Sequence, residues 1–225
     1  MSFNIVTKID DRVEIKNVLV SVFDKTGLDA IIAVLLETCP AVKFYSTGGT
    51  YKALAGILGD AAKDRLVSVS DYTGQPEMQG GLVKTLDFKI YLGLLSEKYN
   101  ADHQSDLARA SAIAIDMVIA NLYPFKQAIA RADATPESAR TNIDIGGPCM
   151  IRASAKNYIR VASVVDSADY PALASELRAS SGSLSLATRF NLMKKSFAHT
   201  ADYDAAIAAH FAATPPEAVA SAYGI

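Results

Sequence analysis

The sequence lacks the residues that would suit a disulfide-stabilised, metal-binding or membrane-spanning protein. Two cysteines, Cys39 and Cys149, cannot build a disulfide framework or a zinc-binding set, so we expect reduced thiols. No apolar run reaches 18 residues, which argues against a membrane-spanning helix. The three histidines show no HExxH motif or related metal spacing, and no nucleophile-elbow motif occurs.

A strong excess of one charge is also missing. The formal net charge of -2 argues against a dedicated nucleic-acid binder, which would be basic. The first 16 residues carry both signs of charge and no apolar core, so a secretory signal is not expected. With 50% hydrophobic and 20% charged residues, the chain is typical of a globular protein. We expect a cytoplasmic location, without a membrane or nucleic acid as partner.

Short apolar runs alternate with stretches of helical periodicity. Five runs predict buried strands at residues 18–22, 42–45, 66–69, 117–121 and 161–165. Such runs predict a parallel sheet with helices on both faces. Thr135 before Pro136 predicts a helix start, and residues 185–213 predict a long helix that Pro215 and Pro216 end. We expect a single α/β domain over residues 1–225 with a helical C-terminal portion, and a loop at 179–185.

Polar residues follow the first predicted strand where a helix begins. Ligands of parallel α/β sheets bind at this end of the strands, beside helix N-termini that attract anions. Ser21 and Thr26 supply hydroxyl groups here and Lys25 supplies a cation, which together suit a phosphate. Helix capping by Asp24 or Thr26 beside a solvated lysine is the alternative.

A second strand-to-helix turn contains the run Thr47, Gly48, Gly49 and Thr50. Glycines let the backbone approach a ligand closely and expose its N–H groups. The run is neither a dinucleotide-binding glycine pattern nor a P-loop, and a plain glycine turn with a threonine cap is the alternative. Two such turns on successive strand–helix units can converge on one anion.

Two later segments offer candidate reactive side chains. A loop shaped by two glycines delivers Lys84 and Thr85, although a surface lysine is the alternative. Tyr123 follows the end of a predicted strand and has a hydrogen-bonding hydroxyl, although a core tyrosine before a proline turn is the alternative.

Asp144 stands between two isoleucines, so we expect it to be partly buried and to need partners. Arg152 and Lys156 lie four residues apart on one face of the next predicted helix. A structural salt bridge with these cations is the alternative to a role in catalysis.

Taken in order, these segments resemble the IMP (inosine monophosphate) cyclohydrolase family, the N-terminal domain of the bifunctional purine biosynthesis proteins. The resemblance spans about residues 16–212 and rests on SVFDKTGL, STGGTYKAL, DYTGQPEMQGGLVKTL, NLYPF, IDIGG, RASAKN and FAHTADYD. Members of that family carry a second, larger domain for formyl transfer. No counterpart of the formyltransferase domain is recognised here, so we expect a stand-alone cyclohydrolase domain.

The resemblance implies a methylglyoxal-synthase-like α/β fold. It implies the dehydrative closure of 5-formamidoimidazole-4-carboxamide ribonucleotide to IMP, without metal or cofactor. Around the reacting groups it implies catalytic roles for Lys84, Tyr123, Asp144 and Lys156, with proton transfer assigned to Lys156. The protein partners that it suggests are a second copy in a homodimer and a separate formyltransferase.

Together, the phosphate interpretation and the resemblance define a set of substrate-binding residues. The set consists of Ser21, Phe23, Asp24, Lys25, Thr26, Thr47, Gly48, Gly49, Thr50, Leu82, Val83, Thr85, Ala120, Asn121, Ile145 and Gly146.

Several positions depart from the family pattern. Leu82 stands where arginine is usual, Asp87-Phe88 where His-Pro is usual, Tyr91 where histidine is usual, and Phe23 where serine is common in part of the family. The missing arginine removes a cation and a bidentate donor. Asp87 adds a negative charge, so both changes oppose an anionic nucleotide.

These departures keep open a non-catalytic nucleotide or phosphate sensor of the same fold. Methylglyoxal synthase and a scaffold for a separate formyl-transfer protein are further alternatives. The segments NLYPF, IDIGG and RASAKN favour the cyclohydrolase over methylglyoxal synthase.

Overall fold

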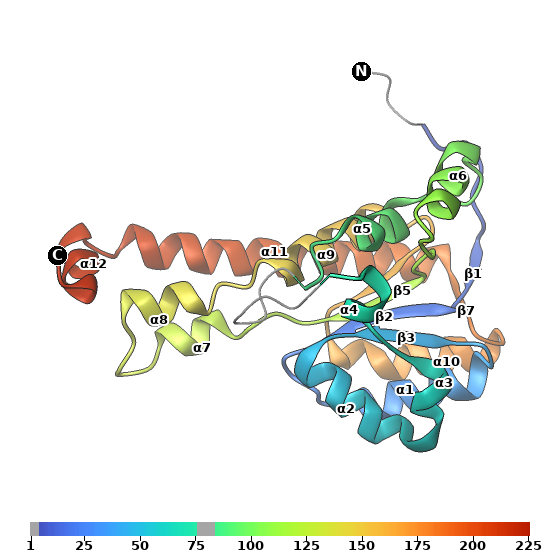
Figure 1. The fold of residues 1–225 in the computed structure, drawn as a ribbon, viewed down its shortest axis with the longest axis horizontal. Helices are drawn as coiled ribbons and strands as arrows, with labels where there is room; N and C mark the ends of the chain where they lie inside the picture. Colours follow the sequence, from blue (N-terminus) through green and yellow to red (C-terminus); the bar gives the residue numbers. More distant parts are fainter. Residues whose placement is uncertain (1–4, 76–83) are drawn as a thin grey trace.

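A parallel β-sheet lies at the centre of the computed structural model, which describes residues 5–75 and 84–225 (Figure 1). The strands are β2 (Asn17–Ser21), β3 (Lys43–Ser46), β4 (Leu66–Ser68), β5 (Met117–Ala120) and β6 (Ala162–Val164). Their order in the sheet is β4-β3-β2-β5-β6. In the central register, Val20 pairs with Ser46 on one side and Ile119 on the other. Each strand coincides with one of the five predicted runs, which confirms the predicted fold class.

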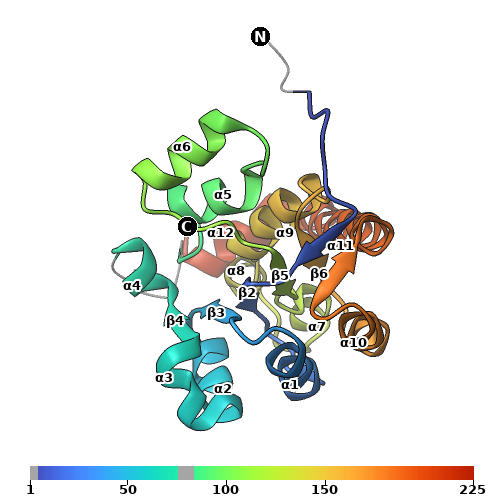
Figure 2. The ribbon, with the colours of Figure 1, turned by 90° about the vertical axis from the view of Figure 1, so that its right-hand side faces the viewer.

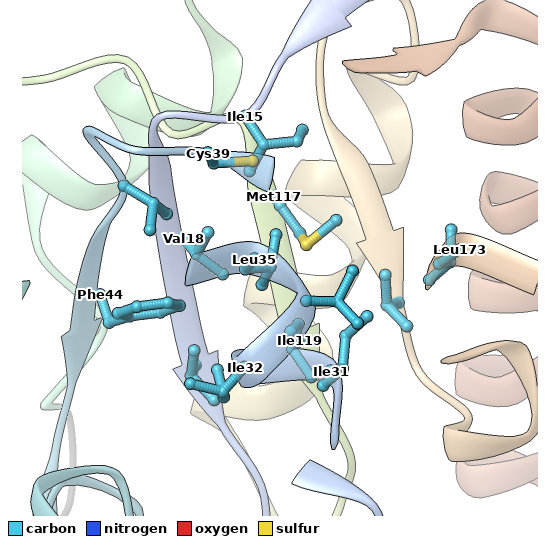
Figure 3. Close-up of a cluster of buried hydrophobic side chains, with 14 of the residues drawn as sticks. Ile15, Val18, Ile31, Ile32, Leu35, Cys39, Phe44, Met117, Ile119 and Leu173 are labelled. Carbon is cyan, nitrogen blue, oxygen red and sulfur yellow. The ribbon is translucent and has the colours of Figure 1, made fainter. Parts of the chain in front are cut away.

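Helices cover both faces of this sheet (Figure 2). On one face lie α1 (Leu28–Thr38), α2 (Gly48–Leu58) and α10 (Tyr170–Ala179), and on the other lie α5 (Phe88–Leu95), α9 (Gly146–Lys156) and α11 (Leu186–Ala212). Successive strand residues therefore enter different cores, with Val18 in one and Leu19 in the other. Figure 3 shows the first core, where Ile31 and Leu35 of α1 lie against the sheet. Burying each such side chain contributes roughly 1.5–3 kcal/mol, which anchors α1 and the turn that precedes it.

Shorter helices complete the described chain. They are η1 (Gly59–Ala61), α3 (Ala62–Arg65), α4 (Val69–Thr73), α6 (Ala101–Arg109), α7 (Phe125–Ile129), α8 (Pro136–Thr141), η3 (Ser167–Asp169) and α12 (Pro216–Tyr223). The predicted start of α8 is confirmed by a capping box, in which Thr135 Oγ1 accepts from the Ser138 N–H at 3.0 Å. The prediction of a long helix is confirmed by α11, but α12, which begins at Pro216, was not predicted. Neither α11, with 27 residues, nor another helix in the described ranges is long and apolar enough to cross a membrane.

The C-terminal half of α11 extends beyond the sheet and forms a helical arm with α7, α8 and α12, at the left of Figure 1. Phe125 of α7 packs against Tyr203 of α11, with ring centroids 6.3 Å apart. Lys126 and Asp202 form an ion pair at 2.7 Å between the same helices. The arm supports the loop between α8 and α9, so it positions one wall of the site.

A small second sheet joins the N-terminal segment to the segment before α11. Within it, β1 (Arg12–Glu14) pairs antiparallel with β7 (Ser183–Ser185). The buried guanidinium of Arg189 donates to the carbonyl oxygens of Asp10 at 2.9 Å and Asp11 at 3.0 Å. The prediction of a loop over 179–185 is therefore wrong at its end. The sequence did not predict β7 because its three residues are too few to show an alternating pattern and its partner β1 is distant in the chain.

Candidate active site

The strand order creates a crevice between β2 and β5. From β2 the chain moves outward through β3 and β4, and it then continues on the other side through β5 and β6. In open α/β sheets, ligands bind at the carboxyl ends of the strands where the strand order reverses in this way. The turns after β2, β3 and β5 meet at this point, and they contain several of the predicted site residues.

Asn121 joins the turn after β2 to the end of β5. Its Oδ1 accepts from the backbone N–H groups of Phe23 at 2.6 Å and Asp24 at 3.0 Å. Its Nδ2 donates to the carbonyl oxygen of Asp24 at 2.7 Å. Because the amide acts as donor and acceptor at once, it holds this turn in one orientation.

Thr50 makes the corresponding connection from the turn after β3. Its hydroxyl accepts from the Val22 N–H at 3.1 Å and donates to the Val22 carbonyl oxygen at 3.0 Å. The side chain is buried, so its hydroxyl shapes the crevice by bonding to the backbone.

These turns surround a pocket of about 350 Å³, a size within the usual range for small-molecule sites. The lining residues are Ser21, Val22, Phe23, Lys25, Thr47, Gly48, Gly49, Thr50, Lys84, Thr85, Asn121, Tyr123, Thr141, Ile143, Asp144, Ile145, Gly146 and Gly147. Three of the four predicted catalytic residues, Lys84, Tyr123 and Asp144, thus come together in one pocket.

Two helices of 11 residues begin at this pocket, α2 at Gly48 and α9 at Gly146. The first N–H groups of a helix lack partners within it, and its dipole is positive at that end. Gly48 has a φ of +51°, which glycine adopts without strain. A Cβ at Gly48 would lie 3.5 Å from Lys84 Nζ, so this ammonium group lies beside the start of α2. Two helix N-termini and the ammonium group of Lys84 together favour the binding of an anion in this pocket.

Asp144 lies against the start of α9. Its Oδ1 accepts from the Gly147 N–H at 2.8 Å. Burial raises the pKa of the Asp144 carboxyl above its usual value, and backbone hydrogen bonds from Gly147 and Tyr123 oppose part of this rise in pKa. A carboxyl in this setting is suited to exchanging a proton with a ligand. Arg152, its alternative partner, instead lies over the Phe197 ring at 5.4 Å from the centroid.

Two aromatic side chains form another part of the pocket lining. Phe23 and Tyr123 pack edge to face, with ring centroids 5.8 Å apart and an interplanar angle of 79°. About half of each side chain is exposed, so a ligand can contact both rings.

Several predicted residues lie elsewhere. Asp24 Oδ1 accepts from the Thr26 N–H at 2.9 Å and from the Thr26 hydroxyl at 2.7 Å, so these two residues cap their own turn. Ala120 is buried at the end of β5. Leu82 and Val83 lie outside the described residues.

Lys156 is exposed at the last position of α9, ten residues beyond Gly146. At about 1.5 Å per residue, the two backbone positions are about 15 Å apart along the helix. The structure therefore does not bring Lys156 to this pocket, and its role in proton transfer stays a prediction.

Three of the unusual positions, Asp87, Phe88 and Tyr91, lie at the start of α5 and do not line the pocket. Asp87 is the N-cap of this helix, and its Oδ1 accepts from the Lys89 N–H at 2.8 Å. Its negative charge therefore faces the positive end of α5. Tyr91 is half-buried on the first turn, and burial raises the pKa of its phenol.

Sequence reasoning missed Val22, Thr141, Ile143 and Gly147, which also line the pocket. Ile143 and Gly147 stand within the IDIGG segment, so that motif contained a signal for them. Thr141 is the last residue of α8 and had no comparable signal. In the described ranges, no three histidine, cysteine, aspartate or glutamate side chains are grouped so that they could hold a metal ion.

The fold and the pocket define an α/β domain with a candidate ligand pocket at the switch point of a parallel sheet. Residues 31–149, more than half of the chain, match the family model of the MGS-like domain. The chain belongs to the family of MGS-like domains. Residues 154–223, which include α11 and α12, match the model of the AICARFT/IMPCHase bienzyme.

Curated relatives of this chain bear the name bifunctional purine biosynthesis protein PurH. The protein from Neisseria meningitidis serogroup C is 47% identical over 193 residues, which cover 86% of this chain and 35% of that protein. The protein from Ruminiclostridium cellulolyticum is 45% identical over 194 residues, with coverage of 86% and 36%. The chain thus spans about a third of the length of these relatives. The crystal structure of ForH superposes with a TM-score of 0.71 at 28% identity, covering 86% of this chain and 97% of that one.

Proposed function

We propose that this domain is an IMP cyclohydrolase, which closes 5-formamidoimidazole-4-carboxamide ribonucleotide to IMP in purine biosynthesis. The observation that carries the proposal is the convergence of Lys84, Tyr123 and Asp144 on one pocket at which α2 and α9 begin. Positive helix ends suit the phosphate of a ribonucleotide, and the three side chains suit its reacting groups. The names of the PurH relatives and the bienzyme match over residues 154–223 support the same activity.

In the proposed complex, the phosphate binds at the turns after β2 and β3. Lys25 and Gly48 line the pocket at these turns, and Lys84 Nζ lies next to Gly48. The imidazole and its two substituents then extend toward Tyr123 and Asp144 on the opposite side of the switch point.

Ring closure requires one new bond and the loss of one water molecule. The carboxamide nitrogen attacks the formyl carbon, and a tetrahedral centre forms. The formyl oxygen then leaves as water, with one proton from the carboxamide nitrogen and one from the formamide nitrogen. Because both reacting groups belong to one molecule, holding the reactive rotamer supplies part of the rate enhancement.

Each pocket side chain has a proposed role in these steps. Asp144 accepts a hydrogen bond from the carboxamide NH₂ and takes its proton, which suits a carboxyl whose pKa is raised by burial. Lys84 and Tyr123 donate to the formyl oxygen as negative charge develops on it. The role assigned to Lys156 through the resemblance would have to act from the far end of α9.

We further propose that the enzyme acts in the cytoplasm, without a metal or cofactor. A homodimer and a separate formyltransferase are its proposed protein partners. Light scattering of the purified chain tests the dimer, and co-purification from cells tests the formyltransferase.

The activity is tested by ultraviolet absorbance, which follows IMP formation from the formamido nucleotide. We expect turnover by the native chain, unchanged by EDTA, loss of turnover in Asp144→Asn, and a large fall in turnover in Lys84→Met. Saturable binding of IMP without turnover would favour the nucleotide sensor instead. Neither binding nor turnover would reject both functions.

A further inference from the structure

We propose that Tyr203 of α11 is a positioning residue for Asp144. The Tyr203 hydroxyl holds both ends of the segment Asn142–Asp144. The long helix α11 therefore supports the active site. This inference rests on the proposed function, because it assigns a catalytic role to Asp144.

The Tyr203 hydroxyl makes two hydrogen bonds to the backbone of this segment. It accepts from the Asp144 N–H at 2.7 Å and donates to the Asn142 carbonyl oxygen at 3.2 Å. Ile143, which lines the pocket, lies between the two bonded residues. A single hydroxyl thus connects α11 to a segment about 60 residues earlier in the chain.

Tyr203 can maintain both bonds because its hydroxyl keeps its proton. The side chain is 7% exposed, and this burial raises the pKa of the phenol above its ordinary value. A neutral phenol donates and accepts at the same time, whereas a phenolate could not donate to the Asn142 carbonyl.

The ring of Tyr203 is itself fixed by its neighbours. Phe125 packs on it at 6.3 Å and 69°, and both residues belong to the core cluster that also contains Ile151 of α9. The adjacent ion pair between Lys126 and Asp202 joins α7 to α11. A side chain locked by packing can hold a loop in a defined place, which is what an active site requires of its supporting residues.

The consequence for Asp144 is that it is held at two points. Tyr203 holds its backbone N–H, and its carboxyl accepts from the Gly147 N–H. Without the hydroxyl of Tyr203, the segment would lose its connection to α11, and water would reach the carboxyl more easily. Its pKa would then return toward the ordinary value, because burial is the main cause of the rise.

The contact also joins the two matched parts of the chain. Asp144 lies within the MGS-like match over residues 31–149, and Tyr203 lies within the bienzyme match over residues 154–223. The FAHTADYD segment, which contains Tyr203, therefore has a physical role in the pocket although it does not line it.

The test is Tyr203→Phe, which keeps the ring and its packing and removes the hydroxyl. We expect kcat to fall about tenfold, the effect of one or two neutral hydrogen bonds, while KM changes much less. The acidic limb of the pH profile of kcat should move to lower pH. Amide hydrogens of a peptide spanning residues 140–147 should exchange faster.

Tyr158→Phe is the matched control, because Tyr158 packs on Phe190 with ring centroids 5.2 Å apart and does not line the pocket.

The measurements separate this inference from the proposed function. Absence of turnover in the native chain rejects the cyclohydrolase, whatever the exchange data show. Unchanged exchange in Tyr203→Phe overturns the inference directly. Faster exchange with an unchanged kcat and pH profile also overturns it, because Tyr203 would then be a structural contact without influence on Asp144.

Discussion

The amide of Asn121 bonds to both polar groups of the Asp24 backbone. Oδ1 accepts from the N–H at 3.0 Å, and Nδ2 donates to the carbonyl oxygen at 2.7 Å. The end of β5 and the turn after β2 are therefore one unit, although 97 residues separate them in the chain. The pocket depends on this connection because both turns line it.

Replacing Asn121 with aspartate tests this connection with little change of shape. The new carboxylate accepts as before, but it cannot donate and would face the Asp24 carbonyl oxygen. We expect the free energy of unfolding to fall by about 1–3 kcal/mol and the affinity for IMP to fall as well. Urea unfolding and calorimetry measure the two effects. Asn191→Asp on the exposed face of α11 is the control, and an equal loss there would refute the explanation.

Two glycines of α2 should respond to alanine in opposite directions. Gly48 has a φ of +51°, so Gly48→Ala should destabilise the protein by about 1–2 kcal/mol. Gly56 lies within the helix with nothing within 4 Å of an added Cβ, so Gly56→Ala should stabilise by about 0.5–1 kcal/mol. Thermal unfolding of both variants checks the signs. The same sign in both would contradict the geometry of this turn.

Two lysines to which the resemblance assigned catalytic roles should differ in their effect on turnover. Lys84 lines the pocket, whereas Lys156 lies at the far end of α9. We expect Lys84→Met to lower kcat/KM by about 100-fold, as for the loss of one charged stabilising group. Lys156→Met should change it less than about threefold. A comparable loss in both variants would restore the proton-transfer role of Lys156 and require a rearrangement of the site.

Asp144→Asn should remove activity and yet increase stability at neutral pH. Burial raises the pKa of Asp144 in the folded protein, so the charged form is disfavoured by folding. The stability that Asp144 contributes is therefore fully present below its unfolded pKa and is lost as pH rises through its folded pKa. The asparagine variant avoids this loss, and its advantage should shrink toward pH 3. Urea unfolding from pH 3 to 8 measures the difference, and an advantage that grows at low pH would contradict the assignment.

Local sequence patterns were sufficient for the main fold. The runs 18–22 and 117–121 became β2 and β5 because continuous β-branched segments suit strands buried on both faces. The helix after Thr135 and the long helix after Ser185 followed from capping residues and helix propensity. Because ligands of such sheets bind at the carboxyl ends of strands, the turns that line the pocket were predictable as well.

These local patterns could not predict which distant segments pair with each other. The strands β1 and β7 are three residues each and stabilise one another across most of the chain, so neither has a period of its own. The use of each polar side chain was also decided in three dimensions. Thr50, Asn121 and Asp24 use their side chains in hydrogen bonds to the backbone of the turn after β2. Lys84 and Asp144 reach the same pocket from segments that are distant in the sequence. A residue type shows what a side chain can bind, but its partners depend on which segments the folded chain brings within about 3 Å.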